Sequence, residues 1–231
     1  MKKIWYKRKG SDVGFFIDED EIFLATEVNG IPLFTDETEI IEKIKKNEDN
    51  FFDFSKNIID IGAFNGCYSM LLNFKYNYCF EPNKITSAML WANAYVREKA
   101  KYTDVYNVAL SDKKGTLTFN GFECEDTTKN TNGEFGYKIE QVECRTLDSY
   151  NLDNIGFIKI DVEGFEEKVI RGGLLTIIGN NYPPILFECW DVDYYGMTQE
   201  KRNSLFNLLK TLGYEILEYW GDFETHLAIH K

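Results

Sequence analysis

The chain has 231 residues, of which 44% are hydrophobic, and carries a formal net charge of −12. This length supports one sizeable α/β core. The acidic balance argues against nucleic acid as a partner, because phosphate binding needs clustered Lys and Arg, and no apolar run of about 18 residues predicts a membrane span.

Residues 1–50 are predicted to be an N-terminal extension of the same domain. Short strands alternate with acidic or Asn-Gly breaks over residues 1–34, as in "VGFFID", "EIFLATE" and "IPLF". A helix is expected from Asp36, with Glu39 three residues later as a capping partner and isoleucines on one face.

Strands and helices then alternate from residue 57 onward. "NIIDIG", "YNYCFEP" and "TDVYNVAL" read as buried strands, separated by the helical patterns "GCYSMLLNF" and "NKITSAMLWANAYVREKA". The inward face of the second helix is predicted to consist of Ala88, Trp91, Ala92, Tyr95 and Val96.

A polar segment interrupts this alternation. "GTLTF" and "KIEQVEC" are expected to pair as strands, and residues 120–138 between them read either as a lid over a ligand or as an ordinary loop. Alternation resumes with the strand "IGFIKIDVEG", one helix over "EEKVIRGGLLTIIG" and the strand "PPILFECW". A helix from Thr198 to Leu212, with Gly213 as its C-cap, precedes the terminal hairpin "YEILEYWGDFETHLAIHK".

The turn after the first buried strand suits a ligand other than a dinucleotide. It reads D-x-G-x-x-x-G from Asp60 to Gly66, and Phe64 stands where a dinucleotide site needs its second glycine. Glu81 follows Gly62 by 19 residues, where an acidic side chain accepts hydrogen bonds from ribose. S-adenosylmethionine fits this pattern. An NAD or nucleotide-sugar enzyme on a Rossmann-like sheet is the alternative.

Six sequence blocks resemble the FkbM family of S-adenosylmethionine-dependent methyltransferases. They are "IIDIGAFNGCYS", "FEPN", "NVALSDKKGTLTF", "CRTLDSY", "IGFIKIDVEGFEEKVIRGG" and "ILFE", and they span roughly residues 55–190. The family's usual glycine turn, D-x-G-A-N-x-G, appears here with Phe64 and Asn65 transposed. The resemblance implies cofactor contacts from Asp60, Gly62, Ala63, Asn65, Gly66, Tyr68, Glu81, Asn83, Ala109 and Leu110.

The fold class follows from the same pattern. A terminal antiparallel hairpin after five β-α units is typical of the class I methyltransferase sheet, a Rossmann-like, mostly parallel, seven-stranded α/β sheet. Residues 51–231 are therefore predicted to form an S-adenosylmethionine-binding methyltransferase domain.

Candidate catalytic residues lie in "FIKIDVEG". Lys159, Asp161 and Glu163 bring ionisable groups to a strand that is expected to be buried on both faces, at a desolvation cost that a purely stabilising role rarely explains. The resemblance places the matching positions in the catalytic cleft, which favours Asp161 as base or acceptor orienter. The alternative for Glu163 is a helix cap, and Lys159 is either a carboxylate partner or a cofactor-orienting group.

Two further strand ends offer polar side chains. Because the last strand runs antiparallel, His226 is predicted near the cleft as a proton acceptor, or else as a surface histidine at the hairpin. Glu188 and Trp190 are predicted to bind the acceptor. Glu188 and Asp161 together are a weak signal for a divalent metal, so a metal-free site is expected.

These observations predict an O-methyltransferase that acts on a hydroxyl of a sugar or glycan. The alternatives are O-methylation of a small polyketide-like metabolite and a non-catalytic cofactor-binding module. Five scattered cysteines without C-x-x-C spacing, and an N-terminus without a signal-peptide pattern, predict a cytoplasmic protein with reduced thiols.

Overall fold

The computed structural model describes residues 3–7, 14–18, 35–119, 124–125, 140–192, 196–218, 220 and 224–231. Its centre is a seven-stranded sheet. In sheet order the strands are β12 (Tyr214–Leu217), β13 (Thr225–His230), β11 (Ile185–Glu188), β10 (Ile155–Ile160), β3 (Asn57–Ile61), β4 (Asn77–Phe80) and β5 (Thr103–Tyr106). Neighbouring strands from β11 to β5 are parallel, and β13 is antiparallel to both β11 and β12. The predicted sheet with its terminal antiparallel hairpin is confirmed.

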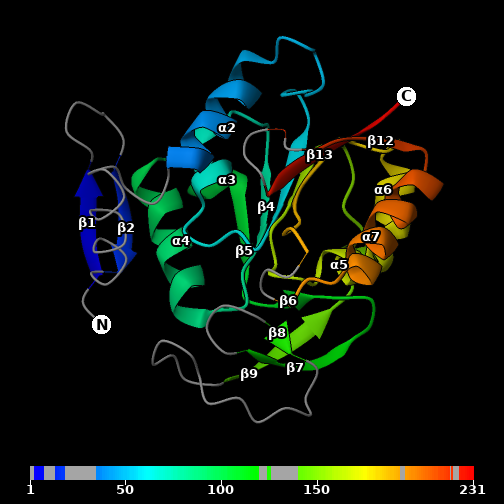
Figure 1. The fold of residues 1–231 in the computed structure, drawn as a ribbon. Coiled ribbons are helices and arrows are strands. Elements are labelled where there is room, and N and C mark those ends of the chain that lie inside the picture. The colour runs from blue at the N-terminus through cyan, green and yellow to red at the C-terminus, as the bar shows by residue number, and fades with distance from the viewer. Residues whose placement is uncertain are drawn as a thin grey trace.

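Helices cover both faces of this sheet (Figure 1). One face carries α2 (Thr35–Lys46), α3 (Cys67–Leu71) and α4 (Lys84–Val96), and the other carries α5 (Glu166–Gly172), α6 (Leu174–Gly179) and α7 (Gln199–Thr211). Short 3-10 turns occur at Ala100–Tyr102 and Leu147–Tyr150. None of the helices in the described part of the chain has the length and apolarity that a membrane crossing requires.

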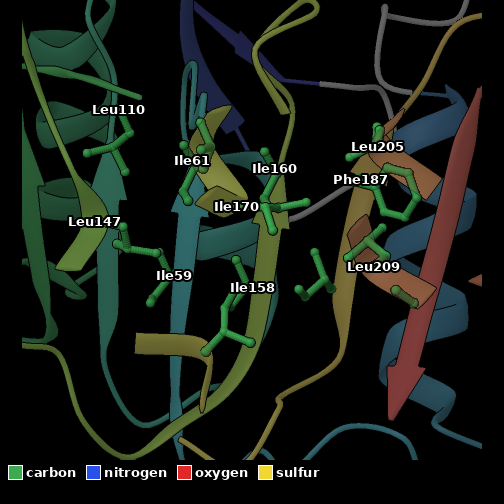
Figure 2. Packing of buried hydrophobic residues seen from close by; sticks show 14 of the residues in the cluster. Ile59, Ile61, Leu110, Leu147, Ile158, Ile160, Ile170, Phe187, Leu205 and Leu209 are labelled. Atoms are coloured by element: carbon green, nitrogen blue, oxygen red, sulfur yellow. The ribbon is translucent and has the colours of Figure 1, made fainter. Parts of the chain in front are cut away.

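The main core lies between the sheet and the second set of helices. Figure 2 shows Ile59, Ile158 and Phe187 from the central strands packed with side chains of α5 and α7. Strand residues on this core are almost completely buried, because a parallel sheet is covered on both faces. The core thereby holds the ends of β3, β10 and β11 at one edge of the sheet.

A second sheet of four strands lies below the first in Figure 1. Its order is β6 (Ala109–Leu110), β9 (Glu140–Arg145), β7 (Gly115–Phe119) and β8 (Cys124–Glu125). The predicted pairing of "GTLTF" with "KIEQVEC" is confirmed as the antiparallel pair β7–β9. The lid predicted for residues 120–138 lies outside the described residues, except for β8.

The N-terminal extension begins with an antiparallel pair, β1 (Lys3–Lys7) and β2 (Gly14–Asp18), which stands beside α4 in Figure 1. The further strands predicted at "EIFLATE" and "IPLF" lie outside the described residues. The helix predicted from Asp36 is confirmed as α2.

The predicted inward face of α4 is wrong. Trp91 and Tyr95 are 52% and 66% exposed, and Val96 is exposed as well, whereas Leu90 and Asn93 are buried. The helix carries apolar residues around most of its circumference, so periodicity alone does not select a face. A hydrogen bond of 2.9 Å from Asn93 Nδ2 to the Asn65 carbonyl draws the polar Asn93 inward instead.

The single helix predicted over "EEKVIRGGLLTIIG" is two helices, α5 and α6, separated at Gly173. Gly172 packs so closely that a Cβ there would lie 2.0 Å from the carbonyl oxygen of Ser111. The glycine pair therefore serves close packing at the point where α5 ends, which a helical pattern of apolar residues does not reveal.

Candidate active site

Four adjacent strands end in polar groups at one edge of the main sheet. Glu81 follows β4, the glycine turn at Gly62 follows β3, Asp161 follows β10, and Glu188 is the last residue of β11. The sheet order β4-β3-β10-β11 arranges these groups in a row. The carboxyl edge of a parallel sheet is where α/β proteins bind ligands.

The glycine turn packs directly against the loop that follows β10. Gly62 has φ +68°, and a Cβ on it would lie 1.7 Å from the carbonyl oxygen of Asp161. Its N–H donates to the Phe80 carbonyl at 3.0 Å, which ties the turn to β4 as well. Only glycine permits this approach, so the turn links three of the strand ends.

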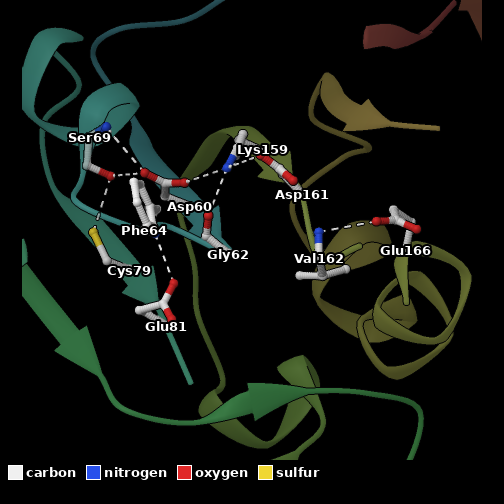
Figure 3. Close-up of polar contacts among 10 residues, drawn as sticks. All are labelled: Asp60, Gly62, Phe64, Ser69, Cys79, Glu81, Lys159, Asp161, Val162 and Glu166. Atoms are coloured by element: carbon white, nitrogen blue, oxygen red, sulfur yellow. Dashed lines mark hydrogen bonds and ion pairs between the residues drawn. The ribbon is translucent and has the colours of Figure 1, made fainter. Parts of the chain in front are cut away.

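A buried ionic network contacts the turn (Figure 3). Asp60 is fully buried and accepts hydrogen bonds from the side chain and the N–H of Ser69, at 2.5 and 3.3 Å. Lys159 Nζ lies 3.1 Å from Asp161 Oδ2 and 3.8 Å from Asp60 Oδ1, and it donates to the Gly62 carbonyl at 2.9 Å. Burial raises the pKa of Asp60 while the charge of Lys159 opposes this rise. The predicted proximity of Lys159 and Asp161 is therefore present, and Asp60, which was predicted to contact the cofactor, is fully buried beside Lys159.

Glu81 combines burial with free acceptor capacity. It is 6% exposed, and its two oxygens accept hydrogen bonds from the N–H groups of Phe64 at 3.0 Å and Asn83 at 2.7 Å. Burial raises the pKa of Glu81 to about 7. A carboxylate has about four lone-pair positions, so about two remain for hydroxyl groups of a ligand.

Asn65 is a buried amide with unsatisfied hydrogen-bonding groups. It is 1% exposed, and neither its Oδ1 nor its Nδ2 has a hydrogen-bond partner among the described residues. Such groups are rare in folded proteins and point to a ligand or an ordered water. The preceding Phe64 has φ +49° and is 41% exposed, so its ring stands at the surface of the turn.

The other residues predicted to contact the cofactor all have structural contacts. Ala63 packs with Cys79 and Leu90, and the buried ring of Tyr68 lies 5.3 Å from Lys159 Nζ. Gly66, with φ +88°, is the N-cap residue of α3, and Asn83 caps α4 through hydrogen bonds from the N–H groups of Ile85 and Thr86. Ala109 and Leu110 are buried in β6. Their predicted cofactor contacts remain predictions.

Three carboxylates meet on the other side of the turn. Asp161, Glu163 and Glu188 each place one oxygen within 4.8 Å of the others, and each side chain is half-buried. Burial, followed by the charges of Asp161 and Glu163, raises the pKa of Glu188 well above its usual range. Trp190, predicted to bind the acceptor with Glu188, is half-buried and packs against the main core.

Glu166 is a further member of this site that the sequence pattern did not reveal as one. It is 2% exposed, and its Oε1 accepts hydrogen bonds from the N–H groups of Val162 at 3.2 Å and Gly164 at 3.1 Å (Figure 3). Burial raises its pKa to about 7. Glu166 thus orders the loop that carries Asp161 and Glu163. The sequence feature that could have identified it is its position in the first turn of the following helix.

The prediction that His226 faces the cleft is wrong. Its ring is fully buried between Phe187 and Phe206, and Nε2 lies 3.2 Å from Arg202 Nη1. Burial and the charge of Arg202 lower the pKa of His226 to about 4. The antiparallel course of β13 places His226 at the carboxyl edge of the parallel strands, as predicted. Its pairing with Phe187, however, directs its side chain into the core under α7.

Comparison with known proteins agrees with this arrangement. Residues 60–216 match the family model described as the methyltransferase FkbM domain. No curated protein matches the sequence. Among solved structures, the chain is similar to the methyltransferase FkbM from Methylobacillus flagellatus KT, with a TM-score of 0.56 and 19% identity over 78% of this chain and 44% of that one. The chain thus covers less than half of that protein's length.

Two other solved structures share the fold. A proposed caffeoyl-CoA O-methyltransferase from Staphylococcus aureus has a TM-score of 0.53 and 13% identity over 93% of both chains. A proposed rRNA methylase from Clostridium thermocellum has a TM-score of 0.53 and 8% identity over 82% of this chain and 93% of that one. At such identities the likeness establishes a common architecture.

Proposed function

Because the chain belongs to the methyltransferase FkbM family, we propose that it transfers the methyl group of S-adenosylmethionine to a hydroxyl group of a sugar or glycan. The observation that carries this proposal is the row of groups at the carboxyl edge of the sheet. Glu81 lies on one side of the glycine turn, which itself contains Asn65, and Asp161, Glu163 and Glu188 lie on the other side. The first side would hold the cofactor, and the second side would hold the acceptor.

The residues of the first side fit S-adenosylmethionine. Glu81 retains lone pairs for the two ribose hydroxyls while it keeps its hydrogen bonds to the turn. The unsatisfied donor and acceptor of Asn65 suit a ligand whose amino-acid end carries both an ammonium and a carboxylate. S-adenosylmethionine is accordingly the cofactor in this proposal.

Methyl transfer to a hydroxyl group requires alignment of the reacting atoms and removal of the hydroxyl proton. When bound, the cofactor supplies a methyl group on a sulfonium: its carbon bonds to the acceptor oxygen while the old carbon–sulfur electron pair stays on sulfur. In this proposal Asp161 accepts the hydroxyl proton, and the ion pair with Lys159 at 3.1 Å supports this role by holding the carboxylate in position. Glu166 fixes the loop between Asp161 and α5. Clustered carboxylates also accept hydrogen bonds from neighbouring hydroxyls, which favours a hydroxyl-rich acceptor.

Calorimetry with S-adenosylmethionine, NAD and a UDP-sugar tests the cofactor. We expect saturable binding of S-adenosylmethionine and no saturable binding of NAD or of the UDP-sugar. Binding of only NAD or the UDP-sugar would remove the proposal.

Transfer of a labelled methyl group to a panel of oligosaccharides and of non-sugar hydroxyl compounds tests the acceptor. Methylation confined to the non-sugar compounds would replace the acceptor class and keep the enzyme class.

The described cysteines Cys67, Cys79, Cys144 and Cys189 are free thiols, which supports the proposed cytoplasmic location.

We expect Asp161→Ala to abolish turnover while it leaves cofactor affinity within about tenfold of wild type. Single-turnover methyl transfer, measured beside calorimetry on the same protein, separates the two effects. Near-normal turnover would exclude Asp161 as the proton acceptor. Glu143→Gln, an exposed change on the small sheet, is the control that keeps both properties.

A further inference from the structure

An aromatic stripe on α4 points away from the protein. Ala88, Trp91 and Tyr95 follow one another at helical spacing, and Trp91 and Tyr95 are 52% and 66% exposed. Their rings stack, with centroids 6.0 Å apart and planes at 12° to each other. β2 runs beside α4 (Figure 1), and both rings keep this exposure with β2 in place. The stripe is therefore a surface that packing within the described chain leaves uncovered.

The exposed apolar surface extends beyond this stripe. Ile85 and Val96 flank it on α4, and Tyr102 follows in the 3-10 turn after the helix. Of the eight large hydrophobic side chains exposed among the described residues, five lie within residues 84–102. Single exposed apolar residues are ordinary, but such a concentration marks an interaction surface. We call these five residues, with Lys84 and Lys101, the α4 face.

The same segment is basic within an acidic chain. Residues 84–102 contain four Lys or Arg and one acidic residue, a net charge of +3, whereas the whole chain carries −12. Lys84 and Lys101 are exposed near the two ends of the α4 face. Lys99 does not add to this surface, because its Nζ donates to the Leu72 carbonyl at 2.5 Å. The charge of the α4 face thus favours an anionic partner.

Two kinds of partner can cover a face of this composition. In a symmetric pair of copies the α4 face would meet itself, so a positively charged segment would oppose its own copy. Lysine is also depleted in interfaces between proteins. At a bilayer surface, by contrast, Trp and Tyr rings lie at the level of the headgroups, and lysines are attracted to anionic lipids.

We propose that the α4 face docks on the surface of an anionic lipid bilayer. Trp91 and Tyr95 enter the headgroup region, and Lys84 and Lys101 contact lipid phosphates. A helix that lies in the plane of the interface needs no membrane crossing.

This surface is separate from the proposed active site. α4 joins β4 to β5 at one end of the sheet, whereas Asp161 and Glu188 belong to β10 and β11 on the other side of β3. The inference therefore does not rest on the proposed function.

Vesicle sedimentation tests the α4 face without cofactor or acceptor. The full chain is mixed with vesicles of phosphatidylcholine, either alone or with an equal amount of phosphatidylglycerol. We expect binding to the mixed vesicles. It should weaken by at least about tenfold when phosphatidylglycerol is omitted or when salt is raised to about 0.5 M.

Two variants test the two parts of the α4 face. Trp91→Ser combined with Tyr95→Ser should weaken binding by at least about tenfold, because it removes the rings that enter the headgroups. Lys101→Glu should weaken it by roughly tenfold, because it reverses a charge that faces the lipid. Leu175→Ser and Lys210→Glu make similar changes at exposed positions of α6 and α7, on the other face of the sheet, and should bind as the wild type does.

Circular dichroism checks that each variant is folded, and sedimentation velocity tests for pairs of copies. Three results would overturn the inference: no binding to the mixed vesicles, equal binding by the folded double variant, or equal weakening by Lys210→Glu and Lys101→Glu. A wild-type dimer that the double variant does not form would assign the α4 face to a second copy instead. Weaker binding of the double variant and of Lys101→Glu, with both controls unchanged, would confirm docking whether or not the protein binds S-adenosylmethionine.

Discussion

At the scale of single residues, the glycine turn contains a bulky side chain in a conformation that suits glycine or asparagine. Phe64 has φ +49°, and its N–H is held by Glu81 Oε2 at 3.0 Å. A left-handed backbone costs a residue with a side chain about 1–2 kcal/mol, and asparagine tolerates it best after glycine. The turn is therefore kept in place by its contacts rather than by the local preference of Phe64.

Phe64→Asn should stabilise the protein by about 1 kcal/mol, because it relieves this strain and the ring is already 41% exposed. The thermal midpoint should rise by about 2–4 °C. Tyr102→Asn, at a similarly exposed aromatic with ordinary backbone angles, should give no such rise. An unchanged or lower midpoint for Phe64→Asn would show that the ring's contacts outweigh the strain.

Glu81 predicts how cofactor binding depends on pH. Its pKa is raised to about 7 by burial, and hydroxyl donors from a ribose favour the charged carboxylate. Binding therefore lowers this pKa and releases protons, so affinity for S-adenosylmethionine should increase up to roughly tenfold between about pH 5.5 and 8. Calorimetry in two buffers of different ionisation enthalpy measures the proton release. Glu81→Gln should abolish it, and a pH-independent affinity of the wild type would contradict the ribose contact.

At the scale of elements, two glycines set how α5 and α6 pack on the sheet. Gly172 touches the backbone of Ser111 beyond β6, whereas a Cβ added to Gly179, at the end of α6, would meet no described atom within 4 Å. Gly172 is needed for the close contact between α5 and the segment after β6, whereas Gly179 has only the low helix propensity of a glycine.

Gly172→Ala should destabilise the chain by about 2 kcal/mol or more, because the added Cβ would lie 2.0 Å from a backbone oxygen that cannot rotate away. Gly179→Ala is the matched control and should be neutral or stabilising by up to about 1 kcal/mol. Urea unfolding measures both free energies of unfolding. Equal values for the two variants would mean that α5 shifts away from β6 at little cost.

At the scale of the whole molecule, buried carboxyl groups couple stability to pH. Glu81 and Glu166 both have folded pKa values of about 7 against an ordinary value of 4.5, because burial penalises their charged forms. Their contribution to stability is fully present below the unfolded pKa and is lost as the pH rises through about 7. His226 acts in the opposite direction, since its pKa is lowered to about 4 and its contribution is lost as the pH falls below 6.5.

Two carboxyls outweigh one histidine, so the free energy of unfolding should fall by about 2 kcal/mol or more between about pH 5 and pH 8. Urea denaturation at several pH values measures this slope. Glu166→Gln should make the slope shallower, whereas Glu143→Gln, on the exposed face of β9, should leave it unchanged. Stability that increases with pH over this interval would contradict the burial of both groups.

Residue order along the chain was enough to predict most of the succession of strands and helices, the terminal hairpin and the glycine turn, because each depends on residues close together in the chain. It also placed Glu81, Asp161 and Glu188 at strand ends, which a parallel sheet brings to one edge. The direction of side chains was set by tertiary packing. Pairing with Phe187 turned His226 into the core, contact with Asn65 turned Asn93 inward, and Glu166 was drawn to the loop before α5. Burial and pairing are properties of neighbours in space, and a periodic pattern specifies an element without naming its neighbours.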